Sequence, residues 1–315
     1  MARMPCSGGL GVPKPSLRIA VVQFAPQIGH VQQNIEKARV FCESISPGSV
    51  DLLCLPEMIF TGYVFESASA ILPFLEHPQT GVTSRFCASV AQKLKCFVAA
   101  GYPERLERHE VEKRTMGDGR VVDVVGANSA VVYGPDGARV GDYRKSHLYC
   151  VDETWAKPGP GFATFRLPPP LNVVTLAICM DLNPRSPWTP DGGPYELAGH
   201  CLETGSGLLV LLNAWLDSGR DPEEEEDAST LDCWATLLRP LWCRMSHDLE
   251  GEDAAPPDAS EDTETIVVVC NRSGVENGST FAGSSALFRL RQTTGKPVLL
   301  ERMGRRQEGV GVWTT

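Results

Sequence analysis

Short apolar runs rich in β-branched residues alternate along this chain with segments whose apolar residues recur every three or four positions. Runs of the first kind predict buried strands, and the turn-forming residues that follow them mark where the strands end. The predicted strands are 17–26, 51–57, 96–104, 173–179, 208–215, 265–273, 279–290 and 296–303.

The periodic segments predict amphipathic helices, since residues three or four positions apart share one helical face. In the first of these segments Ile35, Ala38 and Cys42 lie on such a face. The predicted helices are 34–45, 83–94, 195–205 and 232–245. Pro240 predicts a kink or break in the last one, because proline cannot donate the helical hydrogen bond.

One segment, 128–149, combines two β runs with the turn sequence Gly-Pro-Asp-Gly between them, and so predicts a hairpin. The alternation of strands and helices elsewhere predicts an α/β domain whose buried strands are covered by helices. Residues 1–16 are rich in proline and glycine without periodicity, and we expect a flexible tail followed by one domain over 17–315. The chain has neither internal repeats nor a glycine-rich phosphate loop, which argues against a nucleotide enzyme.

Charge changes this picture only locally. The 315 residues carry a net charge of −10, but 16 acidic and 3 basic residues lie between Asp217 and Glu264. The remainder is slightly basic, so nothing in the chain predicts a nucleic-acid partner. We expect solvated acidic loops at about 217–231 and 248–265, with an acidic-tract partner as the less favoured alternative.

The sequence does not predict a membrane protein or a metal-binding protein. The longest apolar runs are far shorter than the roughly 20 residues of a membrane span, and the N-terminus has no apolar signal core. Eleven scattered cysteines without a CxxC pair predict neither zinc ligation nor a disulfide framework. A reducing compartment fits best: the cytoplasm, with the nucleus as an alternative.

Three polar residues stand where predicted strands end: Glu57, Lys145 and Cys179. Taken singly, each has a structural explanation as a helix cap, a solvated hairpin charge or a small buried hydrophobe. Together they could run acyl transfer, with a thiol nucleophile, a carboxylate base and a cation that stabilises an oxyanion. His147 leaves open a competing Cys-His dyad.

The segments CLPEMIFTGY, YRKSHLY and AICMDLNP, in that order, resemble the three signature regions of the nitrilase superfamily of carbon–nitrogen hydrolases. The resemblance extends over nearly all of 17–313. It implies a four-layer α-β-β-α sandwich and a catalytic triad of Glu57, Lys145 and Cys179. It also implies a second catalytic glutamate, for which Glu153 has the right place and Asp152 is a neighbouring alternative.

Further segments, among them CMDLNP, NAWLDS and LRPLW, are similar to the protein N-terminal asparagine/glutamine amidase branch. This resemblance implies deamidation of an N-terminal Asn or Gln of proteins or peptides through a Cys179 thioester, with no metal or organic cofactor. It implies that Lys145 and the Met180 N–H stabilise the oxyanion. A link to regulated protein degradation also follows from the branch, and the oligomeric state stays open.

A chain terminus is recognised through its α-ammonium group, which oxygen acceptors bind. Asp181, Asn183 and Asp152 are candidates for this task, although Asp181 and Asn183 could instead fix the turn after the cysteine. The other residues expected to shape the substrate pocket are Tyr63, Trp155, Asn213, Trp215 and Ser284. Two alternatives remain: an amidase for a small free carboxamide or ureido acid, and a catalytically silent binding scaffold.

Overall fold

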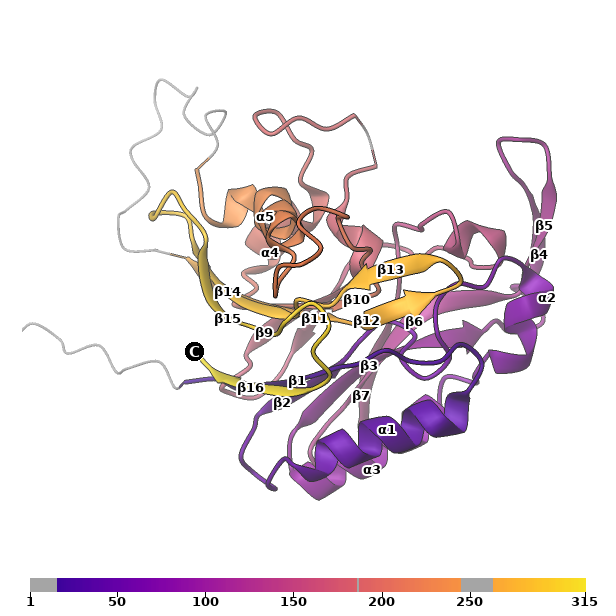
Figure 1. Ribbon diagram of the computed structural model, residues 1–315, viewed down its shortest axis with the longest axis horizontal. Coiled ribbons are helices and arrows are strands. Elements are labelled where there is room, and N and C mark those ends of the chain that lie inside the picture. Colours follow the sequence, from indigo (N-terminus) through magenta and orange to yellow (C-terminus); the bar gives the residue numbers. More distant parts are fainter. Residues whose placement is uncertain (1–15, 186, 245–262) are drawn as a thin grey trace, which may run out of the picture.

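Two six-stranded sheets packed face to face form the centre of the molecule in the computed structural model, which describes residues 16–185, 187–244 and 263–315 (Figure 1). The first sheet has the order β16 (Gly309–Thr314), β1 (Arg18–Gln23), β2 (Leu52–Leu55), β3 (Phe97–Arg105), β6 (Gly126–Tyr133) and β7 (Arg139–Arg144). The second has the order β15 (Val298–Arg302), β14 (Ala286–Arg291), β11 (Glu264–Asn271), β10 (Leu208–Asn213), β9 (Val173–Ile178) and β8 (Ala163–Arg166).

Helices cover the outer face of each sheet. The helices α1 (Val31–Glu43) and α3 (Val82–Leu94) lie against the first sheet, while α4 (Glu196–Thr204) and α5 (Ala228–Leu237) lie against the second (Figure 1). The smaller elements are α2 (Ala68–Ile71), η1 (Leu72–Phe74), η2 (Asp152–Thr154), η3 (Cys179–Leu182), η4 (Arg239–Leu241), and the hairpins β4 (Glu112–Thr115) with β5 (Val121–Val124) and β12 (Ser273–Glu276) with β13 (Ser279–Ala282).

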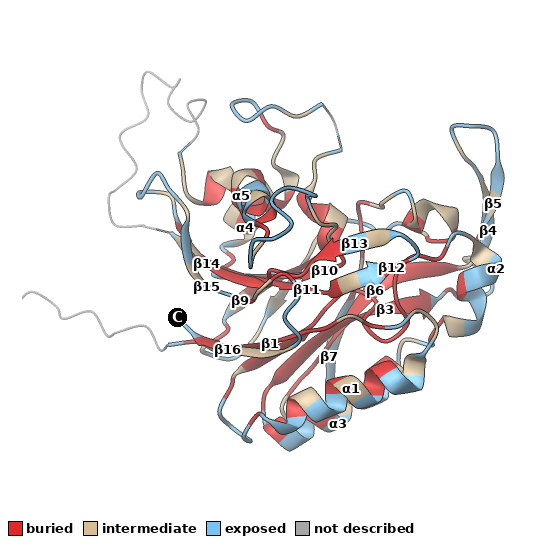
Figure 2. Cartoon of the chain, viewed as in Figure 1, coloured by how far each residue is buried: buried red, intermediate tan, exposed pale blue. Residues whose placement is uncertain are grey.

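The buried residues follow these layers. One apolar cluster fills the space between the two sheets, and one lies under each pair of covering helices. Figure 2 shows the central strands buried along their length and α1 and α3 buried along one side only. The predicted α/β class and the four-layer sandwich implied by the resemblance are therefore confirmed.

The middle strands of each sheet run parallel: β1, β2 and β3 in the first, and β9, β10 and β11 in the second. Parallel strands end at the same edge of a sheet, which is where α/β proteins place reacting groups. Glu57 follows β2 and Cys179 follows β9 directly, so the two motifs come from the facing sheets.

Some predicted boundaries are wrong. The last predicted helix begins at Ala228, because the Asp227 carboxylate caps it by accepting the Thr230 N–H at 3.1 Å. The first acidic loop therefore ends at Asp227, which is fully buried, although residues 223–225 are exposed as expected. The predicted break at Pro240 is confirmed, since α5 ends at Leu237 and the proline lies in η4.

Strand prediction failed where a run of β-forming residues changes sheet. Segment 279–290 divides into β13 and β14, and 265–273 divides into β11 and β12. The strands β4, β5, β8 and β16 were not predicted, and their burial is partial. The tail residues 1–15 and the second acidic segment up to residue 262 lie outside the described residues, so the division into a tail and one domain stays a prediction. None of the described helices is long and apolar enough to cross a membrane.

Candidate active site

Glu57 is fully buried and lies just after the end of β2 at Leu55. Its backbone passes so close to β3 that a Cβ on Gly101 would lie 2.6 Å from the Glu57 Cα. The next residue, Met58, has a φ of +47°, in the left-handed region that side chains rarely adopt. The sharp turn and the close strand together fix where the carboxylate points.

Lys145 follows β7 and is also fully buried. Its Nζ donates to Glu57 Oε1 at 2.6 Å and to Asp152 Oδ2 at 2.7 Å. The interpretation of Lys145 as a solvated hairpin charge is therefore wrong. Because an ammonium group has three donors, one N–H remains after these two bonds.

We call the four buried residues that bond one another here the carboxylate cluster: Glu57, Lys145, Asp152 and Asn128. The Asn128 Nδ2 donates to Glu57 Oε1 at 2.6 Å and to Asp152 Oδ1 at 2.9 Å. The Asp152 Oδ2 also accepts the Tyr63 hydroxyl at 3.1 Å. With both carboxylates ionised, the cluster has a net charge of −1 in a site without solvent exposure.

Cys179 lies at the turn from β9 into η3 with a φ of +43°, a backbone conformation that costs about 1–2 kcal/mol for a residue with a side chain. Asn213 Oδ1 accepts its N–H at 3.0 Å. Asp181 supports the same turn: its carboxylate accepts N–H groups from Ile178 and His147, each at 2.8 Å. The thiol is thus presented from a rigid corner, with the residue 8% exposed.

Ala214 links the Glu57 segment to the Cys179 turn. Its N–H donates to Glu57 Oε2 at 2.7 Å, and the residue lines the same cavity as Cys179. Burial raises the pKa of the Cys179 thiol well above its ordinary value; the Glu57 charge adds to the rise and Lys145 opposes it. The cysteine is therefore a neutral thiol at rest and needs a base before it can react.

The charges in the cluster suit that need. Burial raises the pKa of the Glu57 carboxyl, and Asp152 adds to the rise while Lys145 and Asn128 oppose it. Burial alone would lower the pKa of Lys145, but Asp152 and Glu57 outweigh it and raise the pKa, so the lysine stays charged. Glu57 is thus a stronger base than an exposed carboxylate, beside a permanent cation.

A mostly apolar cavity of ≈ 270 Å³ opens in front of the cysteine. It is lined by Tyr63, Tyr149, Cys179, Met180, Asn183, Ala214, Trp215 and Leu216. Four of the expected substrate residues, Tyr63, Met180, Asn183 and Trp215, are among them.

The other expected substrate residues are not among the lining residues. Asp152 bonds within the carboxylate cluster, Asp181 holds the turn, and Asn213 lies behind the nucleophile. Trp155 is fully buried in the apolar cluster around Met58. The Ser284 hydroxyl is also fully buried and accepts the Asp227 N–H at 2.9 Å. Each of these side chains has a structural role in the described residues, and the expectation that they contact substrate stays a prediction.

The structure places Glu153 and Asp152 differently with respect to Lys145. Asp152 contacts Lys145, whereas the Glu153 carboxylate has no hydrogen bond or ion pair to Lys145 in the part of the chain that the structure describes. Side chains one position apart in the short helix η2 point in different directions, which is why spacing could not separate them. The alternative base, His147, bonds through Nδ1 to the Asn183 carbonyl at 2.7 Å, and no described bond joins it to Cys179.

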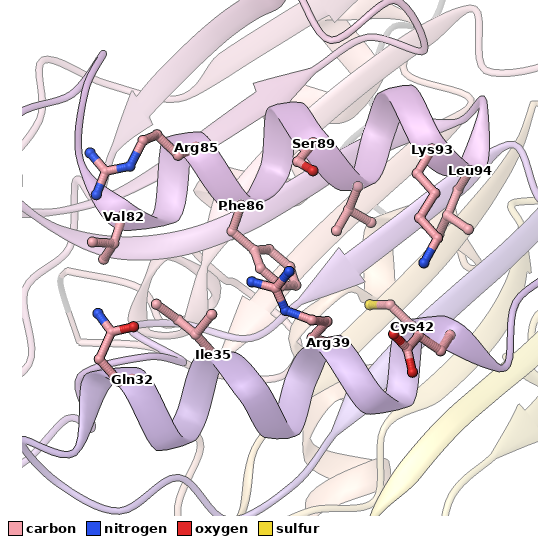
Figure 3. Close-up of a pocket in the computed structure, with 12 residues that line it drawn as sticks. Gln32, Ile35, Arg39, Cys42, Val82, Arg85, Phe86, Ser89, Lys93 and Leu94 are labelled. Carbon is pink, nitrogen blue, oxygen red and sulfur yellow. The ribbon is translucent and has the colours of Figure 1, made fainter.

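A second hollow lies far from this chemistry. The groove between α1 and α3 also has a volume of ≈ 270 Å³, and Arg39, Arg85 and Lys93 line it (Figure 3). None of the residues of the carboxylate cluster line it. Its one cysteine, Cys42, lies on α1 and not at the end of a parallel strand, and burial raises the pKa of its thiol to about 12.

Comparison with known proteins agrees with this geometry. The carbon–nitrogen hydrolase family matches residues 18–192, a range that contains Glu57, Lys145 and Cys179. The chain belongs to this family. Curated relatives include the protein N-terminal amidase of Schizosaccharomyces pombe, 29% identical over 90% of this chain and 94% of the relative. The protein N-terminal amidase of Saccharomyces cerevisiae is 27% identical over 64% of this chain and 46% of the relative.

Among solved structures, an N-terminal amidase with an Asn-Glu peptide has a TM-score of 0.76 to this family member and 20% identity, with 95% of this chain and 97% of the other covered. At that identity the likeness shows the fold.

Sequence reasoning missed Asn128, Tyr149 and Ala214. Asn128 begins the apolar run NSAVVY, and a polar residue at the start of a buried strand was the only available signal. Ala214 acts through its backbone, which no side-chain motif reports.

Proposed function

We propose that this protein hydrolyses the side-chain carboxamide of an Asn or Gln at the N-terminus of a peptide or protein, giving Asp or Glu and ammonia. The observation that carries the proposal is the buried Glu57–Lys145 pair next to a cavity whose wall contains Cys179. The similarity to an N-terminal amidase over 90% of the chain supports the choice of substrate.

The reaction begins when Glu57 accepts the Cys179 proton and the thiolate attacks the carboxamide carbon. The developing oxyanion receives the remaining N–H of Lys145 and the N–H of Met180, and loss of one such donor typically costs about 3 kcal/mol of transition-state stabilisation. Glu57 then gives its proton to the leaving ammonia, and a thioester on Cys179 remains.

Water completes the cycle. Glu57, ionised again, takes a proton from a water molecule that attacks the thioester carbonyl, and the same two donors stabilise the second oxyanion. Collapse of this intermediate releases the carboxylic acid, and Glu57 returns the proton to the cysteine. Asp152 keeps Lys145 in place throughout.

Selectivity for a terminus follows from the charge and shape of the cavity. The net negative charge of the carboxylate cluster favours a cationic α-ammonium nearby. Asn183 supplies an amide oxygen, and the rings of Tyr149 and Trp215 can face a cation. The small apolar volume accommodates one terminal residue better than a continuous chain. We also propose that the protein works in the cytoplasm or nucleus, where thiols remain reduced.

The test is to incubate the protein with peptides that begin with Asn, Gln or acetyl-Asn, and to follow ammonia release and peptide mass. We expect the free Asn and Gln peptides to be deamidated and acetyl-Asn to be spared. Equal processing of acetyl-Asn would refute recognition of the terminus while leaving an amidase. Faster hydrolysis of free small carboxamides would instead favour the small-amide alternative.

A further inference from the structure

Asn128 occupies an unusual position for a neutral side chain, because it lies between the two carboxylates that hold Lys145. It is fully buried on β6, and its backbone carbonyl accepts the Lys145 N–H at 2.8 Å. Its Nδ2 bonds Glu57 Oε1 at 2.6 Å and Asp152 Oδ1 at 2.9 Å. One short residue thus controls the lysine backbone and both of the lysine's anionic partners.

This arrangement makes the two oxygens of Glu57 different. Oε1 receives two donors, Lys145 Nζ and Asn128 Nδ2, each at 2.6 Å, so both of its lone pairs are used. Among the described residues, Oε2 receives only the Ala214 N–H, at 2.7 Å, and so keeps one lone pair. The Ala214 N–H that bonds Oε2 also lies within hydrogen-bonding reach of the Cys179 thiol, whose pKa it lowers against the larger rise from burial, so Oε2 is the oxygen on the side of the thiol.

A lysine alone would fix this geometry poorly. Its ammonium ends a four-carbon chain, and a carboxylate bound at one point can rotate about that point. Asn128 fills the second lone pair of Oε1 while the Ala214 N–H holds Oε2, so the two oxygens cannot exchange places. The Asn128 Oδ1 is buried without a hydrogen-bond partner among the described residues, so the nitrogen alone explains why an amide is present.

We propose that Asn128 is a positioning residue that bridges Glu57 and Asp152 and leaves only Glu57 Oε2 free to accept the Cys179 proton. This inference rests on the proposed use of Glu57 as base, but it holds for any amide substrate. The proton moves from Sγ to Oε2, and the same oxygen later delivers it to the leaving nitrogen.

The proposal predicts a change in pH dependence when the bridge is removed. The titratable groups around Glu57 are Lys145, Asp152, Cys179, Tyr63 and Arg272, and all of them remain in an Asn128 variant. Losing the Asn128 donor removes an interaction that favours ionised Glu57, so the Glu57 pKa rises further. The acid limb of any step that needs this base moves to higher pH.

The experiment compares Asn128→Ala with Asn34→Ala. Asn34 is a matched control: it is 2% exposed, and its Nδ2 also donates twice, to the Gln27 carbonyl at 2.7 Å and the Phe60 carbonyl at 2.9 Å. Two rates are measured against pH: peptide deamidation, and alkylation of Cys179 by iodoacetamide followed by peptide mass. The second rate needs the base but no substrate, so it tests Asn128 even if the proposed substrate is wrong.

We expect Asn128→Ala to lower kcat by about 10- to 100-fold, the value of a hydrogen bond to a charged group, and to move the acid limb of both profiles upward. Asn34→Ala should leave both limbs in place. If Asn128→Ala does not fold, Asn128→Ser, which keeps one donor, should give a smaller shift in the same direction. Unshifted profiles in a folded variant, or failure of both variants to fold, would overturn the positioning role.

Discussion

Gly101→Ala is the sharpest test of how the fold places the base. Gly101 lies on β3, and a Cβ there would meet three backbone atoms: the Glu57 Cα at 2.6 Å, the Met58 N at 2.8 Å and the Pro56 O at 2.9 Å. Backbone atoms cannot rotate away as the end of a side chain can. The substitution therefore pushes β3 and the Glu57 segment apart.

The size of the effect follows from these distances. Nonbonded carbons need about 3.5 Å or more, so the Glu57 backbone must move by roughly 1 Å. A displacement of this size at a reacting group costs on the order of 100-fold in rate. Overpacking of a well-packed interior costs about 1–3 kcal/mol of folding free energy, which a protein with a core of this extent should survive.

The assay measures kcat for an Asn peptide together with the free energy of unfolding in urea. Gly199→Ala is the control: a Cβ on this glycine of α4 meets nothing within 4 Å, and alanine in a helix interior stabilises by about 1 kcal/mol. We expect a folded Gly101→Ala with a kcat about 100-fold lower and a Gly199→Ala with the parent rate. A folded Gly101→Ala with unchanged kcat would refute the reasoning.

Three other experiments, with five substitutions in all, test the assignments around the cavity. Asp152→Asn should move the acid limb of kcat/KM to lower pH, because the Asp152 charge helps to raise the Glu57 pKa, whereas Glu153→Gln should not move it. Cys179→Ala should abolish turnover, on the order of 10⁴-fold or more, and His147→Ala should cause a milder loss; equal losses would restore the Cys-His dyad. Asp181→Ala should cost at least about 3 kcal/mol in urea unfolding, because it leaves several buried donors unpaired; a near-neutral effect would show that water replaces the carboxylate.

The strands and the order of the catalytic motifs could be predicted from sequence because both are local signals. Runs such as 173–179 are apolar because both faces of the strand are covered. The structure buries β9 between the apolar cluster that lies between the two sheets and the cluster under α4 and α5. Glu57 and Cys179 could be proposed because strand ends in parallel sheets meet at one edge. These inferences need no knowledge of side-chain contacts.

The roles of the polar residues near the cysteine could not be predicted in the same way. The sequence made contact with substrate and support of the turn equally plausible for Asp181. It holds the turn because its oxygens accept N–H groups from Ser146 and His147, 35 and 34 residues earlier. Asn128 is 71 residues from Glu57, and only the pairing of β3 with β6 brings that part of the chain to the site. Contacts between distant segments decide such roles, and a single sequence does not contain them.

Burial and the second carboxylate together explain why a buried lysine does not disable the base. A single carboxylate bonded to a single ammonium has its pKa lowered, which makes it a poor acceptor for a thiol whose own pKa is raised. Here burial is the main cause that raises the pKa of Glu57, and the Asp152 charge adds to the rise by opposing part of the Lys145 attraction, while Lys145 stays protonated. Burial and the second negative charge together let Glu57 act first as a base toward Cys179 and then as an acid toward ammonia, and they leave a cation beside the developing oxyanion.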